Sequence, residues 1–493
     1  MAVYRSHTFW IAGLCALLLF SGLLAARLGL LPKGGQPPMP QGERSLPDRD
    51  TWMNIIQNGR KIGFSHSVLE KQPDGYRLQE TLFMRINTMG MVHGIRLRTT
   101  GALHSDLTLA AFDFDISSGR FSFSMRGTVS DRLLTLTTGS AGHPRTTTVR
   151  LRDKPYLAAG LLDTVRWAAL EPGETRTVQV FDPATMGQEP VNIRVEDQES
   201  ISIMGRMHSA RRVALEFKGV TQQAWIDADG RVLKEKGFLG ISLERTSRRE
   251  ALGGLPIEAS QDLTRVASVA ANGTLDDIAA LNRLVVEIDG IDTAAVHLDQ
   301  GRQKLQIKRL TIRRENLEDL AGRDIRLQLT PHERRFLAPT PFIQADHPAI
   351  RKTAADITAG GGGTLETARK LVEWVNVHVE KRPVISLPDA LSTLENRVGD
   401  CNEHAVLLAA LARAAGIPAQ VEAGLVYLKG RFYYHAWNLL FLNRWVTADA
   451  LLGQLPADVT HIRLSGGKPQ DQLDLMNVIG RIRLKIIEPP PGG

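Results

Sequence analysis

The sequence predicts an α+β protein in several parts: an N-terminal membrane helix, a β-rich domain, a small α+β segment and a C-terminal domain in which a helix precedes paired strands. The 493 residues are too many for one ordinary core. Hydrophobic residues at 43% and charged residues at 23% are typical of globular proteins and exclude a disordered or fibrous class. The apolar pattern changes from alternation in the first half to a helical period near residue 400, which indicates strands first and helices later.

The first element is an uncharged apolar run, "TFWIAGLCALLLFSGLLAA", over residues 8–26. As a helix rising about 1.5 Å per residue, it is long enough to cross a bilayer. We expect residues 1–30 to be a membrane anchor or signal segment, and we favour an anchor because "LLAARL" is a poor cleavage site. Cys15 lies inside this run as an apolar residue. The soluble domains are then expected outside the cytoplasm, in the periplasm, after a Pro- and Gly-rich linker at residues 31–50.

Residues 51–254 are predicted to form the β-rich domain. Alternating and β-branched runs such as "RTTTVRLRD" and "TRTVQVFD" dominate this region, with hairpin signals at Asn58-Gly59 and Asp229-Gly230. Residues 255–344 are predicted to form the small α+β segment, with a helix at residues 273–288 and strands at residues 302–312 and 323–330. Residues 345–485 form the C-terminal domain, in which Thr364 is expected to cap the first long helix.

Cys401 is the one cysteine outside the N-terminal run, so the exported part has no partner for an intramolecular disulfide. Such a thiol is either buried and inert or kept for its reactivity. Asp400 and Glu403 have the spacing of a capping box, which places Cys401 at the first position of a helix that ends before Gly416. The free N–H groups and positive dipole of a helix start favour an anion, so we expect a lowered thiol pKa.

His435 and Asp449 supply a base and an orienting carboxylate downstream of that cysteine. They lie on two strand-like runs around a polar break at Asn443-Arg444, so a hairpin brings them onto adjacent strands. Cys401, His435 and Asp449 are therefore predicted as a nucleophile, a base and its orienter. Trp437, two residues beyond the histidine, is expected to shield the site. Each residue taken singly has a structural explanation, as a buried thiol, a half-buried histidine or a turn cap.

No cofactor or metal is expected. Cys401 and His404 have a zinc-like spacing, but a second cysteine pair is missing from the soluble part, which argues against a structural zinc. No acidic loop typical of calcium sites is present in the sequence. The net charge of +7 is spread over scattered residues without a long basic run, so nucleic acid is not an expected partner. The expected partners are a protein or peptide substrate and the membrane, while the oligomeric state has no signal.

Three blocks, "GDCNEHAVLLAALARAAGIPAQ", "YYHAWN" and "WVTADALLGQLPADVTHIRL", resemble the transglutaminase-like superfamily of papain-related thiol enzymes, over about residues 345–480. The resemblance implies that Cys401, His435 and Asp449 form a triad. Asp400 and Glu403, as the helix cap, and Trp437, as a shield, are predicted to support this site from their positions in the sequence. It also implies a Cys thioester that is completed by hydrolysis or by transfer to an amine. A non-catalytic envelope scaffold that uses the same module for protein binding is the alternative. A lipid- or carbohydrate-binding role of residues 51–250 is a third hypothesis.

Overall fold

The computed structural model describes residues 46–493 apart from 120, 139–143, 165–170, 183–186, 218–219, 321–326, 385–387, 467–477 and 490–493. The predicted membrane helix and the linker up to residue 45 lie outside these residues. Every helix that is described is too short or too polar to cross a bilayer. The fold is β-rich and ends in helices that pack on a smaller sheet, as the sequence predicts in outline.

A single 15-stranded sheet contains the first half of the described chain. Its strand order runs from β8 to β1 and then from β15 to β9. The first and the last strands in sequence, β1 and β15, pair with each other and join two runs of consecutive strands into one sheet. All neighbours are antiparallel except β9 and β10. The predicted hairpin signals are correct: Asn58 and Gly59 have positive φ values of 50° and 77° between β1 and β2.

The strands of this sheet alternate buried and exposed residues, as one-sided sheets require. Buried Leu, Met and Phe side chains form its largest core cluster, which includes Leu78, Leu109, Phe112 and Leu136. The strands are β1 (Arg49–Gln57), β2 (Arg60–Gln72), β3 (Gly75–Thr88), β4 (Met91–Leu103), β5 (Leu109–Ser118), β6 (Phe121–Ser130), β7 (Leu133–Thr138), β8 (Arg145–Arg150), β9 (Tyr156–Leu157), β10 (Thr175–Asp182), β11 (Gly187–Ile203), β12 (Arg206–Phe217), β13 (Val220–Ile226), β14 (Val232–Lys236) and β15 (Ile241–Thr246).

The helix predicted at residues 273–288 is wrong. The chain there forms one 3₁₀ turn, η3 (Ile278–Ala280), followed by the strand β17 (Arg283–Asp289). β17 pairs with β19 (Arg309–Arg313) and with β26 (Arg483–Glu488) at the far end of the chain. Partners so distant in sequence override the local helical pattern. The strand predicted at residues 302–312 is correct as the hairpin β18 (Gln303–Gln306) and β19, whereas residues 327–330 of the last predicted strand are not a strand.

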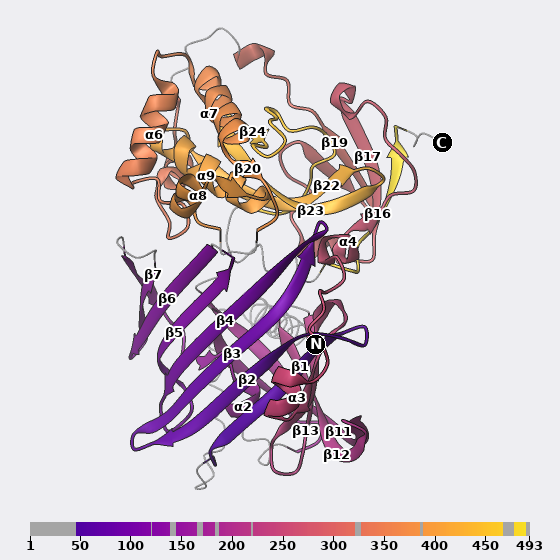
Figure 1. Ribbon diagram of the computed structural model, residues 1–493. Helices are drawn as coiled ribbons and strands as arrows, with labels where there is room; N and C mark the ends of the chain where they lie inside the picture. Colours follow the sequence, from indigo (N-terminus) through magenta and orange to yellow (C-terminus); the bar gives the residue numbers. More distant parts are fainter. Residues whose placement is uncertain are drawn as a thin grey trace, which may run out of the picture. The chain divides into compact units, whose positions relative to one another are not determined.

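The C-terminal part is a sheet with helices on one face. Its strand order is β16 (Val269–Ala270), β23 (Arg431–Phe441), β22 (Ala419–Leu428) and β25 (Ile462–Ser465), and β24 (Trp445–Ala448) also pairs with β23. Helix α9 (Cys401–Ala414) packs on β22 and β23, and around it lie α6 (Pro348–Thr358), α7 (Thr364–His378) and α8 (Ala390–Asn396) (Figure 1). Residues of α9 from Ala405 to Ala412 are all buried, so α9 is the centre of this core.

Gly363, and not Thr364, is the N-cap of α7, and Thr364 is the first helical residue. The remaining elements are short. They are α2 (Leu161–Thr164), η2 (Phe238–Gly240), α3 (Arg248–Gly253), α4 (Leu263–Ala267), η4 (Thr293–Ala295), η5 (Glu318–Leu320), α5 (Pro331–Arg334), η6 (Arg335–Leu337), β20 (Glu380–Lys381) and β21 (Val398–Gly399).

Candidate active site

The start of α9 has the predicted capping box. The Asp400 carboxylate accepts a hydrogen bond from the backbone N–H of Asn402 at 3.0 Å, and the Glu403 carboxylate accepts one from the N–H of Asp400 at 3.0 Å. Cys401 is the first helical residue, is partly exposed and has a free thiol. The capping residues therefore place the thiol at the helix start, as the sequence predicts.

A hairpin brings the predicted histidine and aspartate together. β23 and β24 pair from Asn438 opposite Ala448 to Phe441 opposite Trp445, so the turn is centred on Asn443, at the predicted polar break. Asp449 follows the last paired residue, and its carboxylate Oδ2 lies 2.6 Å from Nε2 of His435. Because Nε2 is taken by the carboxylate, Nδ1 is the ring nitrogen left to exchange a proton with a thiol.

The thiol meets the histidine strand at the residue after His435. The N–H of Ala436, the residue after His435, hydrogen-bonds to the sulfur of Cys401. β16 pairs with residues 431 and 432 of β23, and β24 pairs with residues 438–441, so neither strand covers the segment between them. Asn438 fixes the helix against this strand, because its buried side-chain amide donates to the carbonyl of Ala405 at 2.9 Å.

The lowered thiol pKa expected from the helix dipole is wrong. Burial raises the pKa of the Cys401 thiol well above its usual value, and the nearby carboxylates of Asp400, Glu403 and Asp449 raise it further. The N–H of Ala436 lowers the pKa but does not outweigh them. The main physical reason is burial, and the cap adds to it: two carboxylates already lie at the positive end of the helix, so a third anion on sulfur is disfavoured.

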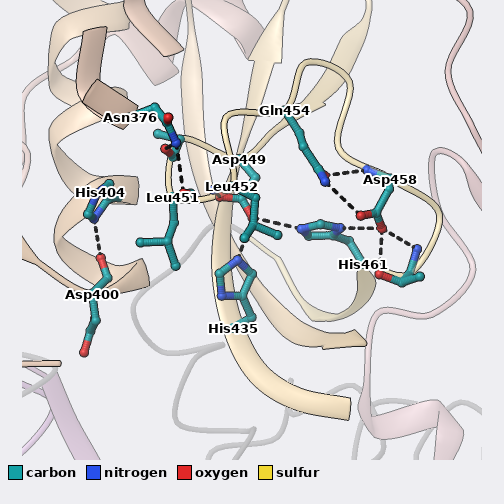
Figure 2. A network of polar contacts seen from close by, with 12 residues as sticks. Asn376, Asp400, His404, His435, Asp449, Leu451, Leu452, Gln454, Asp458 and His461 are labelled. Atoms are coloured by element: carbon teal, nitrogen blue, oxygen red, sulfur yellow. Dashed lines mark hydrogen bonds and ion pairs between the residues drawn. The ribbon is translucent and has the colours of Figure 1, made fainter. Parts of the chain in front are cut away.

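Asp449 is held at four points, as Figure 2 shows in part. Its Oδ1 accepts from the N–H of Leu452 at 2.9 Å, and its backbone forms a two-bond bridge with Gln454. Its Oδ2 accepts from two imidazoles, that of His435 at 2.6 Å and that of His461 at 3.0 Å. Burial alone would raise the pKa of this carboxyl, but the two imidazoles hold it well below its usual range. Asp449 is therefore a carboxylate near neutral pH.

His461 is the residue that sequence reasoning missed. Its ring is fully buried and lies between two aspartates (Figure 2). Nε2 contacts the Asp449 carboxylate, and Nδ1 lies 3.2 Å from the Asp458 carboxylate. The only signal was the close spacing of an aspartate and a histidine in "ADVTHIRL", within the third block of the resemblance. That loop has no helical or strand period until β25 begins at Ile462, so pattern analysis passed over it.

Trp437 lies where the sequence predicts. It is buried, its ring lies 6.2 Å from that of His435 between centroids, and it meets the His461 ring edge-on at 5.2 Å. His404 is buried, and its Nδ1 hydrogen-bonds to the carbonyl of Asp400 in its own turn. This hydrogen bond ties the ring to its own helix.

A cavity of about 880 Å³ lies on the face of the sheet that carries Trp437. Its wall includes His461 and the buried ion pair between Glu422 and Arg463, whose N–O distance is 2.9 Å. Cys401 and His435 are not among its lining residues.

The ring nitrogens of His435 and His461 and a carboxylate oxygen of Asp449 lie within 4.8 Å of one another, close enough to hold a metal ion. The same atoms are joined by the hydrogen bonds of 2.6 and 3.0 Å. A metal with ligand bonds near 2.0–2.2 Å would have to replace both hydrogen bonds and displace their protons. The hydrogen-bonded network accounts for the arrangement without an ion.

Residues 351–450 match the family model of the transglutaminase-like superfamily. The resemblance predicted from the three sequence blocks is confirmed, and this part of the chain is a transglutaminase-like domain. No curated protein matches the chain.

Three solved structures are similar to it at low identity. They are a β-barrel-like protein from Brucella abortus (10% identity, 41% of this chain and 100% of that chain, TM-score 0.31), a putative cysteine protease from Cytophaga hutchinsonii (16%, 44% and 78%, 0.26) and the periplasmic domain of TgpA from Pseudomonas aeruginosa (16%, 53% and 87%, 0.25). All three TM-scores are below 0.5, so these similarities support no conclusion about function.

Proposed function

We propose that the transglutaminase-like domain is a thiol-dependent acyl-transfer enzyme that acts on peptide or side-chain amide bonds. The observation that carries the proposal is the 2.6 Å hydrogen bond from His435 Nε2 to Asp449, which fixes the ring and leaves Nδ1 for the thiol. The sulfur of Cys401 lies beside the same strand, against the N–H of Ala436. A nucleophile, a base and an orienting carboxylate in this order are the parts that covalent acyl transfer needs.

The raised thiol pKa assigns the first proton transfer to the histidine. As the sulfur attacks the amide carbonyl carbon, the thiol proton passes to His435, and Asp449 stabilises the imidazolium that forms. The imidazolium then gives this proton to the departing amine, which leaves a Cys401 thioester. Water or a second amine attacks the thioester with His435 again as base, and the thiol is restored. Hydrolysis and crosslinking differ only in this last nucleophile.

Three variants test the proposal: Cys401→Ala, His435→Ala and Asp449→Asn. Casein is incubated with the protein, alone or with a dansylated amine, and peptide release and dansyl incorporation are measured. We expect the cysteine variant to lose both signals and the histidine variant to lose about 10²–10⁴-fold in rate. Wild-type protein that gives neither signal with casein, and that also fails to react with an acyl-type electrophile at Cys401, would refute the enzyme.

The scaffold alternative makes the opposite prediction. A module kept only for protein binding would show no acyl product, and its partner would be captured equally by wild type and by Cys401→Ala. The chain is proposed to work outside the cytoplasm, because its apolar N-terminal run is long enough to anchor the soluble part to a membrane. Fusion of alkaline phosphatase to the C-terminus, active only when exported, tests that location.

A further inference from the structure

Both ring nitrogens of His461 face carboxylate oxygens. Nε2 lies 3.0 Å from Oδ2 of Asp449, and Nδ1 lies 3.2 Å from Oδ1 of Asp458. A neutral imidazole carries one N–H and can donate only one of these hydrogen bonds. Either His461 is a cation that donates both, or one of the two aspartates is protonated.

The other hydrogen bonds of the two aspartates favour the anion on each of them. In Asp458, Oδ1 accepts from the N–H of Thr460 at 2.8 Å and from its hydroxyl at 2.6 Å, while Oδ2 accepts from the amide of Gln454 at 2.9 Å. In Asp449, Oδ1 accepts from Leu452, and Oδ2 accepts from His435. These hydrogen bonds and the neighbouring imidazoles hold the pKa of both carboxyls below the usual range, so both groups are anions near neutral pH and His461, which faces both, is an imidazolium.

The positive charge of His461 weakens the ability of Asp449 to stabilise a proton on His435. An isolated carboxylate favours an imidazolium on the triad histidine and therefore a thiolate–imidazolium pair. Here His461 already donates to the same carboxylate oxygen and offsets part of the Asp449 charge, and its ring centroid lies 5.6 Å from that of His435. A second imidazolium on the same carboxylate oxygen is disfavoured by repulsion between like charges.

The other charged groups around the two histidines do not change this balance. Arg302, which donates to the backbone carbonyl of His461, is paired with Glu315 at 2.9 Å, and Arg463 is paired with Glu422 at 2.9 Å. On the thiol side, the charges are the carboxylates of Asp400, Glu403 and Asp449. These anions disfavour a thiolate, so the surroundings of both partners favour a neutral pair.

We propose that His461 is a positioning residue whose fixed positive charge on Asp449 keeps Cys401 and His435 as a neutral thiol–imidazole pair until substrate is attacked. The proposal rests on the proposed function for its catalytic meaning. It concerns the ionisation of the resting enzyme, which can be measured without any substrate. The domain would thus differ from thiol enzymes that rest as a thiolate–imidazolium ion pair.

The test is the pH profile of Cys401 alkylation by iodoacetamide in the full chain, measured by peptide mass spectrometry. His461→Gln keeps a donor to Asp449 but removes the charge, so His435 can hold a proton. We expect alkylation near pH 7 to become several-fold faster than in wild type. In the His435→Ala background the same substitution should give no gain, because the gain requires an imidazolium on His435. A direct effect of His461 on the sulfur would appear in both backgrounds.

A second variant guards against a folding defect in His461→Gln. Asp458→Asn removes one of the carboxylates that keep His461 protonated, so alkylation near pH 7 should again become faster. Profiles that are unchanged, or that move to higher pH in both folded variants, would overturn the proposal. Absence of acyl transfer in the wild type would refute only the enzyme, since alkylation needs no catalysis.

Discussion

Asp400 has two opposed effects on the same helix start. Its carboxylate caps α9 and so fixes the position of Cys401, but its charge also raises the pKa of the thiol, after the larger effect of burial. The sequence predicted the cap correctly from the spacing of Asp400 and Glu403. It missed the electrostatic consequence, because the helix dipole was counted and the charges that neutralise it were not.

Two substitutions at this residue separate the cap from the charge. Asp400→Asn keeps a capping side chain and removes the charge, so stability should change little while alkylation of Cys401 near pH 7 becomes faster. Asp400→Ala should also speed alkylation, but it should lower the free energy of unfolding by about 0.5–2 kcal/mol. Urea denaturation and iodoacetamide labelling measure both effects. Slower labelling in the asparagine variant would contradict the assigned cause of the raised pKa.

At the scale of elements, the hairpin β23–β24 and the loop before β25 build the site together. The sequence predicted the hairpin because its two strand-like runs flank a polar turn, where Asn443 adopts a positive φ of 62°. It did not predict that β25 returns beside β22, which is what brings His461 to Asp449. Such pairing depends on the register between strands separated by a long loop, for which no local pattern exists.

Gly424 on β22 allows β25 to pair closely with β22. A Cβ at this position would lie 2.0 Å from the carbonyl oxygen of Ile462 and 2.9 Å from the Trp437 ring. Gly424→Ala should therefore push β25 away from β22, lower the melting temperature and weaken the contact of His461 with Asp449. Gly466→Ala is the matched control, because a Cβ there meets nothing within 4 Å. Equal melting temperatures for the two variants would show that β25 does not need the close approach.

At the scale of the whole molecule, the buried residues form separate clusters in the large sheet and in the helix-covered sheet. The sequence predicted the β-rich first half from alternation, since that pattern is local to each strand. The error at residues 273–288 arose because β17 is a strand through its pairing with β26. β26 lies near the C-terminal end of the described residues, so no local sequence pattern reveals this pairing. The boundaries at residues 254 and 344 remain predictions.

The free energy of unfolding should depend on pH in the way that buried Asp449, Asp458 and His461 dictate. Burial would lower the pKa of His461, but Asp449 and Asp458 raise it above the value in the unfolded chain. Protonated His461 therefore stabilises the folded protein fully below about pH 6.5, and this stabilisation is lost as the pH rises through the pKa of His461 in the folded protein. The two aspartates have lowered pKa values, so their stabilisation is present above about pH 4 and is lost in acid. The network therefore stabilises most between these limits.

His461→Gln removes the histidine part of that profile. The difference in unfolding free energy between wild type and this variant should be largest at mildly acidic pH and should shrink toward alkaline pH. Urea denaturation of both proteins at several pH values measures the difference. A difference that grows with rising pH would mean that His461 is neutral in the folded protein.

The most direct measurement of the central claim is the rate at which Cys401 is acylated by a nitrophenyl ester, followed by intact-protein mass spectrometry. If His435 takes the thiol proton, wild type forms an acyl adduct on Cys401 near pH 7 and His435→Ala forms it about 10²–10⁴-fold more slowly. Equal rates in the two proteins, or an adduct on another residue, would contradict the account.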